Sequence, residues 1–394
     1  MKHLILILAV ACVLPYAEAQ YAVSLEPLAI AEAPALQSFA WARNGSYLLL
    51  VGGRTDGLHK RQPFAAFDPQ FDNHYLWVVD LAERRTWKRA IEGLSPDLTD
   101  QLHSTNMAFA QVGDSLFLAG GYGYSTHEEK HMTYPFLTAM AVPKVIDAII
   151  AGYSPASFMQ QIRDERMAVA GGRMGWLGDR VFIAGGHRFD GPYNPMGADH
   201  GPGFTQTYTD ELRSFRVVQG DDHMVIRDYQ ARHDALQLHR RDYNLVPQIF
   251  PDGEPGYTMF AGVFQHNEDI PFLNSVDIKA NGYATNESFG QYLSHYHTAT
   301  LPIYNAHSNE MTTVFFGGIS HFYADAAGRL IRDMDVPFIR TISTVTRTAD
   351  GQMSERILPG QMPALLGAGS ELVLHSGVPA SPHGVMLLDE RSED

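Results

Sequence analysis

A short apolar strand that ends in glycine recurs along this chain, and this repeat restricts the fold more than any other feature. Three clear copies end in Gly-Gly, and they occupy residues 47–53, 116–121 and 181–186. Three weaker copies occupy residues 259–262, 314–318 and 372–377. Glycine lets the backbone turn sharply at the end of a closely packed strand, where a side chain would collide. Six copies at quasi-regular intervals predict an assembly of similar, neighbouring units.

Each unit extends beyond its glycine strand to four strands. In the first unit, a third strand at 75–81 ends near Asp80, and a turn leads to a fourth strand that contains Trp87. In the second unit, a strand at 107–111 precedes the glycine strand. This order, with Gly-Gly after one strand, Asp ending the next and Trp opening the last, resembles the kelch repeat. The resemblance implies a β-propeller whose blades are four-stranded sheets.

We therefore expect an all-β fold, a six-bladed kelch-type β-propeller, because such a blade buries its faces only against its neighbours. Only one clear strand, at 384–388, follows the sixth copy. The N-terminal segment 21–25 is expected to supply the outer strand of the last blade and so close the ring. Residues 20–394 then form one domain. A short helix at 143–150 and a long loop at 189–207 are expected additions to the second and third blades.

The first 19 residues have the pattern of a signal peptide, with Lys2, an apolar run at 4–14 and small residues at 17 and 19. This predicts an extracytoplasmic protein, either periplasmic or secreted. Lipid anchoring at Cys12 is the weaker alternative, because the apolar run continues through this residue. No later stretch reaches the roughly 18 apolar residues that predict a membrane span. Cys12 is the only cysteine, so the mature chain is expected to contain no disulfide and no thiolate metal site.

The charge balance bears on possible partners. The chain carries 29 basic and 44 acidic residues, a formal net charge of −15, which would repel a nucleic acid backbone. The sequence contains no nucleophile-elbow motif, no phosphate-binding Walker loop and no metalloprotease helix motif. We predict no cofactor and no nucleic acid partner.

Histidine and arginine collect at two places in several of the units, just before the first strand and just after the glycines. In a propeller these two kinds of connection emerge on one face, around a central funnel. The predicted ligand-binding residues of this funnel face are Arg54, His103, Asn106, Arg166, His187, Arg188, His239, Arg241, His266, His295, His297 and His321. The tyrosines that could stack on a sugar are Tyr122, Tyr124, Tyr243 and Tyr296. The main alternative for each histidine or arginine is a structural hydrogen bond to the neighbouring blade.

Two functions compete at this stage. The first is a recognition module that binds a polar or acidic ligand, such as a carbohydrate, or a protein partner. The second is a sugar mutarotase or epimerase, which the kelch resemblance suggests and which needs a carboxylate beside a cation. The pairs that offer this are Glu165 with Arg166 and Asp242 with Arg241. The resemblance also includes galactose oxidases, but their cofactor needs a cysteine that the mature chain lacks.

A histidine-ligated metal site is a less favoured prediction. The pair His295 and His297 has the spacing of two side chains on one side of a strand. No third ligand lies in evident register with this pair, so we predict no metal.

Overall fold

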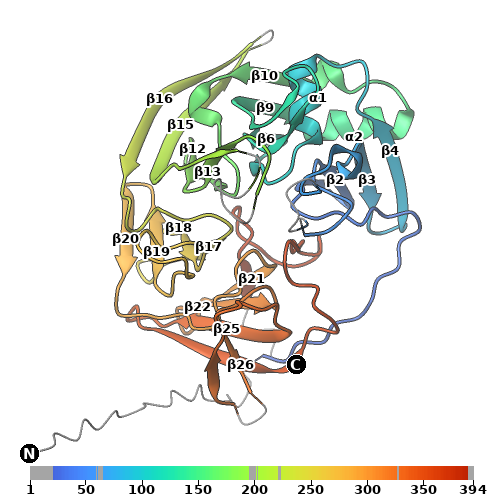
Figure 1. The fold of residues 1–394 in the computed structure, drawn as a ribbon. Helices are drawn as coiled ribbons and strands as arrows, with labels where there is room; N and C mark the ends of the chain where they lie inside the picture. The colour runs from blue at the N-terminus through green and yellow to red at the C-terminus, as the bar shows by residue number, and fades with distance from the viewer. Residues whose placement is uncertain are drawn as a thin grey trace, which may run out of the picture.

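The computed structural model describes residues 21–58, 60, 65–194, 201, 203–220, 223–325 and 328–388. Five sheets of four or five strands, antiparallel except for one strand pair in the last, are arranged around a central axis as the blades of a β-propeller (Figure 1). The predicted propeller is confirmed, and the predicted number of six blades is wrong. The predicted signal peptide and Cys12 lie outside the described residues. Within the described part of the chain, no helix is long and apolar enough to cross a membrane.

In blades 1 to 4 the first strand is innermost and the chain moves outward; blade 5 follows the same order from β21 and adds β27 on the inner side of β21. Blade 1 contains β1 (Ala40–Asn44), β2 (Tyr47–Val51), β3 (Tyr75–Asp80) and β4 (Arg85–Ala90). Blade 2 contains β5 (Ala108–Val112), β6 (Ser115–Ala119), β9 (Phe136–Ala141) and β10 (Met159–Arg163). Blade 3 contains β11 (Arg173–Leu177), β12 (Arg180–Ala184), β15 (Glu211–Gln219) and β16 (Met224–His233). Blade 4 contains β17 (Asn244–Ile249), β18 (Pro255–Phe260), β19 (Ser275–Lys279) and β20 (Gly282–Asn286). Blade 5 contains β21 (Thr300–Asn305), β22 (Glu310–Phe316), β25 (Thr341–Arg347), β26 (Met353–Gln361) and, beside β21, β27 (Met386–Leu388).

The glycine pairs let neighbouring blades touch through their backbones. Gly120 has φ +67°, and a Cβ placed there would lie 1.9 Å from the carbonyl oxygen of Val169, in the connection to the next blade. The equivalent Gly52 and Gly185 face backbone carbonyl oxygens of the next connection in the same way, at 2.4 Å. Gly121 N then donates to Val169 O at 2.9 Å. The repeated glycines therefore form contacts between blades in addition to turning the chain.

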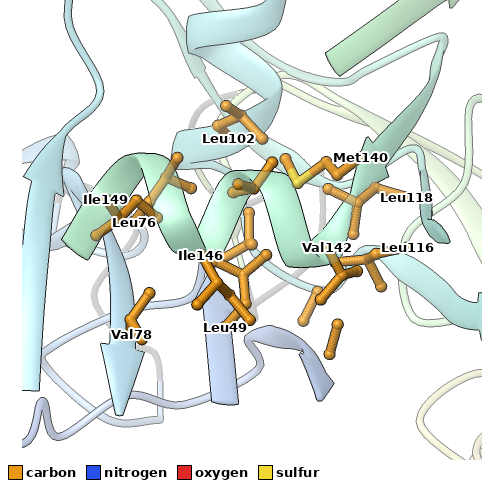
Figure 2. Close-up of a cluster of buried hydrophobic side chains, with 14 of the residues drawn as sticks. Leu49, Leu76, Val78, Leu102, Leu116, Leu118, Met140, Val142, Ile146 and Ile149 are labelled. Atoms are coloured by element: carbon orange, nitrogen blue, oxygen red, sulfur yellow. The ribbon is translucent and has the colours of Figure 1, made fainter. Parts of the chain in front are cut away.

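The predicted helix is present as α2 (Val142–Ala151), which follows β9 directly. Pro lies in its first turn, and Gly152 ends it in the left-handed conformation with φ 81°. Its buried face packs Val142, Ile146 and Ile149 into one cluster with Leu49 and other side chains of blades 1 and 2 (Figure 2). The helix thus covers apolar surface that the blades alone would leave exposed.

The sixth glycine copy does not form a blade. Residues 319–361 complete blade 5, and only the C-terminal segment 362–388 remains. This segment enters the central channel, where Glu371 forms an ion pair with Arg173 on the inner strand of blade 3. Its last strand, β27, pairs in parallel with β21. Within the described residues, this segment adds the single strand β27 to blade 5 and lines the channel, and it forms no blade of its own.

The N-terminal segment does not supply the predicted outer strand. Residues 21–25 form no strand, but Tyr21 and Val23 pack against the apolar cluster of blade 5. Further along, Ile30 and Leu36 pack against the cluster of blade 1. Figure 1 shows this segment running between the two blades. Side-chain packing therefore joins the first and last blades where hydrogen bonding of a strand was expected.

The connections that follow the glycines emerge on the same face as the connections between blades, as predicted from the repeat. Isolated bridges join the two kinds of connection at Thr105 with Tyr122 and at Ala170 with His187. We call this the funnel face. Its additional elements are the hairpins β7 (Tyr122–Ser125) with β8 (Lys130–Thr133), β13 (His187–Asp190) with β14 (Thr205–Tyr208), and β23 (Phe322–Ala324) with β24 (Leu330–Arg332).

Besides α2, the described residues form the helix α1 (Pro96–His103) and the short 3-10 helices η1 (Pro69–Phe71), η2 (Ala156–Phe158) and η3 (Glu165–Met167).

Candidate ligand site at the propeller axis

Five equivalent residues, one from each blade, meet at the axis on the funnel face. Each lies just before an inner strand and has the left-handed backbone conformation, with φ between 54° and 65°; the five are Ser38, Asn106, Gly171, Asp242 and His297. They line a cavity of about 10 Å³, which is about the space of one water molecule. We call this cavity the axial site.

Backbone hydrogen bonds hold these residues in place. Asn106 N donates to Ser38 O at 3.1 Å, Gly171 N donates to Asn106 O at 3.2 Å, and Asp242 N donates to Gly171 O at 2.8 Å. The C-terminal segment continues the ring, because Gly369 N donates to His297 O at 2.6 Å. The left-handed conformation costs a non-glycine residue about 1 kcal/mol or more, and such residues cluster at functional sites. The axis holds four of them in one small cavity.

Asp242 is the charged group among these five residues. Its Oδ2 lies 2.5 Å from Nη1 of Arg241, and its side chain is 19% exposed. Burial opposes ionisation of Asp242, but the adjacent guanidinium of Arg241 outweighs it and holds the pKa of the carboxyl below its usual value. Nε of Arg241 also donates to the hydroxyl of Tyr208 at 3.1 Å. The carboxylate is therefore ionised at neutral pH. The guanidinium of Arg241, which is itself bound to Tyr208, orients it.

Two histidines next to Asp242 are neutral. Burial, with the nearby charge of Arg173, lowers the pKa of His297. Burial, with Arg241, lowers the pKa of His187 to about 3. Nδ1 of His187 lies 2.7 Å from the side-chain amide of Gln206. A neutral imidazole offers one donor and one acceptor, so both rings add hydrogen-bonding capacity without charge.

All four predicted arginines have carboxylate partners. The pairs are Arg54 with Asp56 and Asp72, Arg166 with Asp164, Arg188 with Asp190 and Glu165, and Arg241 with Asp242, at 2.5 to 2.9 Å. Within the described residues, this predicted set therefore supplies no unpaired cation to the funnel face. An acidic ligand would have to displace an existing ion pair.

A second group of predicted residues lies beside the axial site. His239 stacks on Tyr208 with ring centroids 3.8 Å apart, and its Nδ1 lies 2.7 Å from Asp210 Oδ1. The ring of His266 meets His239 edge-on at 5.1 Å. Because Tyr208 also accepts from Arg241, this group extends the polar surface outward from the axis.

The structure does not bring three predicted residues to the axis. His103 ends helix α1 and lies edge-on to His74, with ring centroids 4.7 Å apart. Arg166 lies 4.2 Å from the ring centroid of Tyr229 on the outermost strand of blade 3. The buried His321 accepts from Arg332 Nε at 2.7 Å. In these connections a helix, a 3-10 turn and a hairpin carry the side chains away from the funnel.

The predicted tyrosines have two different roles. Tyr122 and Tyr243 are buried, and their hydroxyls donate to Gly191 O at 2.8 Å and to Ala184 O at 2.6 Å. Tyr124 and Tyr296 remain partly exposed on the funnel face. Of the four, only these two can meet a ligand without rearrangement.

His295 and His297 do not form the predicted pair on one side of a strand. Both have positive φ, 44° and 55°, so the alternation of side chains along a strand does not apply. His295 is fully buried, with Nδ1 2.5 Å from Gly317 O and Nε2 2.7 Å from Ser343 Oγ. His295 therefore links the backbone at Gly317 to the side chain of Ser343 within blade 5. His297 instead faces the axis.

Acid is expected to destabilise the protein through its buried histidines. Burial lowers the pKa of His295 to about 4, so between pH 6.5 and 4 the unfolded chain binds a proton that the folded chain excludes. Stability therefore falls as the pH falls, by about 2 kcal/mol at pH 5 for this one residue. Unfolding free energies at pH 7.5 and 5 should show a smaller difference in His295→Gln. The same substitution at the exposed His223 should leave the difference unchanged, and an equally steep wild-type and His295→Gln profile would contradict this assignment.

Sequence reasoning missed most of the axial site. It named Asn106 and His297, and it considered Asp242 only as a catalytic partner of Arg241. Ser38 and Gly171 carry no chemical signal of their own. The five units aligned on their inner strands would have shown that these positions are equivalent.

Neither a protein-family model nor a curated protein matches this chain. The kelch assignment therefore rests on the sequence pattern. Within the described part of the chain, no group of three or more histidine, cysteine, aspartate or glutamate side chains is placed to hold a metal ion.

Proposed function

We propose that this protein is an exported, kelch-type propeller of one domain, residues 20–394, that binds a neutral polar ligand at the axial site of the funnel face. The observation that carries the proposal is the convergence of Asp242, His297, Asn106 and Ser38 on one small cavity. A ligand that rests over the axis would place one hydroxyl or amide in this cavity. The signal-peptide pattern supports export, and the glycine repeat supports the kelch assignment.

The electrostatics favour a neutral ligand, such as a carbohydrate, over an acidic one. The predicted arginines are paired with carboxylates, and the histidines nearest the axis are neutral. An ionised Asp242 accepts hydrogen bonds from ligand hydroxyls and repels a ligand carboxylate. The partly exposed Tyr296 offers an aromatic ring beside the same site.

A mutarotase or epimerase is the second candidate, and the pairing of Asp242 with Arg241 is the observation that favours it. General acid–base catalysis works best when the pKa of the catalytic group lies near the working pH. The pKa of His187 is about 3, that of Asp242 is below its usual value, and burial raises that of Tyr296 to about 12. No group of this set is poised to donate and accept a proton at neutral pH, so binding is the better supported function.

The test is a thermal-shift measurement on residues 20–394 with glucose, galactose and glucuronic acid. A neutral sugar should raise the melting temperature more than the acid does. Asp242→Asn keeps the shape and removes the charge, and we expect it to weaken sugar binding about tenfold. Asp190→Asn, at a surface ion pair of the same face, is the matched control.

Two outcomes would overturn this proposal. Unchanged sugar binding in Asp242→Asn would remove the axial site from recognition. Anomer interconversion that the protein accelerates, and that Asp242→Asn abolishes, would establish the enzymatic alternative. Exchange of the anomeric resonances in the NMR spectrum of glucose measures this rate directly.

A further inference from the structure

A second and much larger cavity, of about 620 Å³, occupies the central channel. Inner strands of all five blades line it, together with the C-terminal segment. It extends to Gly113, in the turn between β5 and β6, and to the exposed Ser376 and Ala380. The cavity therefore opens on the face opposite the funnel face. We call it the channel cavity, and its volume is in the range of cavities that hold small organic ligands.

An ion pair separates the channel cavity from the axial site. Arg173 and Glu371 line both cavities, and Arg173 Nη1 lies 3.0 Å from Glu371 Oε1. Trp41 Nε1 donates to the other carboxylate oxygen of Glu371 at 3.4 Å. The two charges cancel, so this end of the channel cavity is electrically neutral.

Flat side chains form much of the wall. Trp41 lies edge-on to Phe109, with ring centroids 6.5 Å apart. Trp176 lies 4.2 Å from the ring of His383, whose Nδ1 is 3.3 Å from the hydroxyl of Tyr257. Burial lowers the pKa of His383, so this ring is neutral at neutral pH. Such a wall favours a ligand with a flat apolar or aromatic body.

Arg43 gives the channel cavity a charge. Nε of Arg43 donates to Gly45 O at 2.6 Å, and Nη1 donates to Leu374 O, both of which are neutral carbonyl groups. Within the described residues Arg43 has no carboxylate partner, unlike the arginines of the funnel face. Its Nη2 group makes none of these hydrogen bonds. In a chain with a formal net charge of −15, this cavity therefore carries a local positive charge.

We propose that the channel cavity binds an organic anion with a flat apolar body. The carboxylate or sulfonate of the ligand pairs with Arg43, which offers a planar donor group to such anions. The body of the ligand lies between the indole rings of Trp41 and Trp176. This site is independent of the axial site and of any sugar recognition there.

A matched pair of fluorescent probes tests the proposal. Anilinonaphthalene sulfonate has a flat aromatic body with one anionic group, and N-phenylnaphthylamine has the same rings without it. We expect the folded protein to bind one molecule of the sulfonate and to lose about tenfold in affinity in Arg43→Gln, with little change for the neutral amine. Arg89→Gln is the control, because Arg89 also donates to a backbone carbonyl, Gly152 O at 2.9 Å, but lies on the outer strand β4.

A second variant keeps the test decisive if Arg43→Gln unfolds. Ser376→Trp places a large side chain in the exposed mouth of the cavity, and we expect it to abolish binding of both probes. Melting temperatures establish that each variant is folded. Equal affinity of wild type, Arg43→Gln and Ser376→Trp for the sulfonate would overturn the proposal, as would absence of binding to the wild-type protein.

Discussion

Gly120→Ala is expected to destabilise the protein by about 2–5 kcal/mol, the largest effect that we predict for the addition of a single methyl group. The added Cβ would lie 1.9 Å from Val169 O, a backbone atom in the connection between blades 2 and 3. The same backbone carbonyl accepts from Gly121 N, so relief of the collision would break a contact between the blades. Overpacking of this kind costs about 1–3 kcal/mol, and the left-handed backbone adds about 1–2 kcal/mol.

Gly113→Ala separates these two contributions. Gly113 lies in the turn of the same blade and has φ +56°, close to the +67° of Gly120, but a Cβ there meets no atom within 4 Å. We expect it to cost only the conformational part, about 1–2 kcal/mol. Chemical unfolding of both variants measures the difference. Equal losses would show that the repeat glycines serve the turn alone and not the contact between blades.

Removal of the C-terminal segment should be the second large effect. A chain that ends after Gln361 loses Leu372 and Met386, which pack against the apolar cluster of blade 5, and Val373, which packs against blade 1. Full burial of an apolar side chain contributes about 1.5–3 kcal/mol, and these three side chains are partly buried, so we expect a loss of about 3 kcal/mol in unfolding free energy. Loss of Glu371 also leaves Arg173 without its carboxylate partner.

The control for this truncation is Leu366→Ser, because Leu366 belongs to the same segment but is 59% exposed. Its stability should match that of the wild-type protein within about 0.5 kcal/mol. A truncated protein that unfolds at the wild-type denaturant concentration would show that the segment is not part of the folded core. It would then have to occupy the channel without stabilising the ring.

The number of blades shows where the repeat pattern stops being informative. Each strand–glycine copy reports only its own turn, and the copy at 372–377 has the same local pattern as the others. Whether a copy becomes a blade depends on how many residues remain to form partner strands. The copy at 372–377 finds no such partner strands among the described residues, and it lies in the channel against inner strands that are distant in sequence.

The axial site shows the same limit for chemistry. The concentration of histidine and arginine on the funnel face was predictable, because the order of strands sets which connections share a face. The convergence of Asp242, His187 and His297 was not predictable, because they come from three different blades. Burial keeps His187 and His297 neutral, and the predicted arginines form ion pairs with nearby carboxylates.

The sequence alone determined the propeller class, the glycine turns and helix α2, because each depends on residues that are close together in the chain. Only the tertiary structure decided the five blades, the C-terminal segment in the channel and the residues that meet at the axis. These features depend on packing between segments up to about 330 residues apart, as in the hydrogen bond from Trp41 to Glu371. Closure of the ring depends on contacts between residues that are distant in sequence, and a local sequence pattern does not specify such contacts.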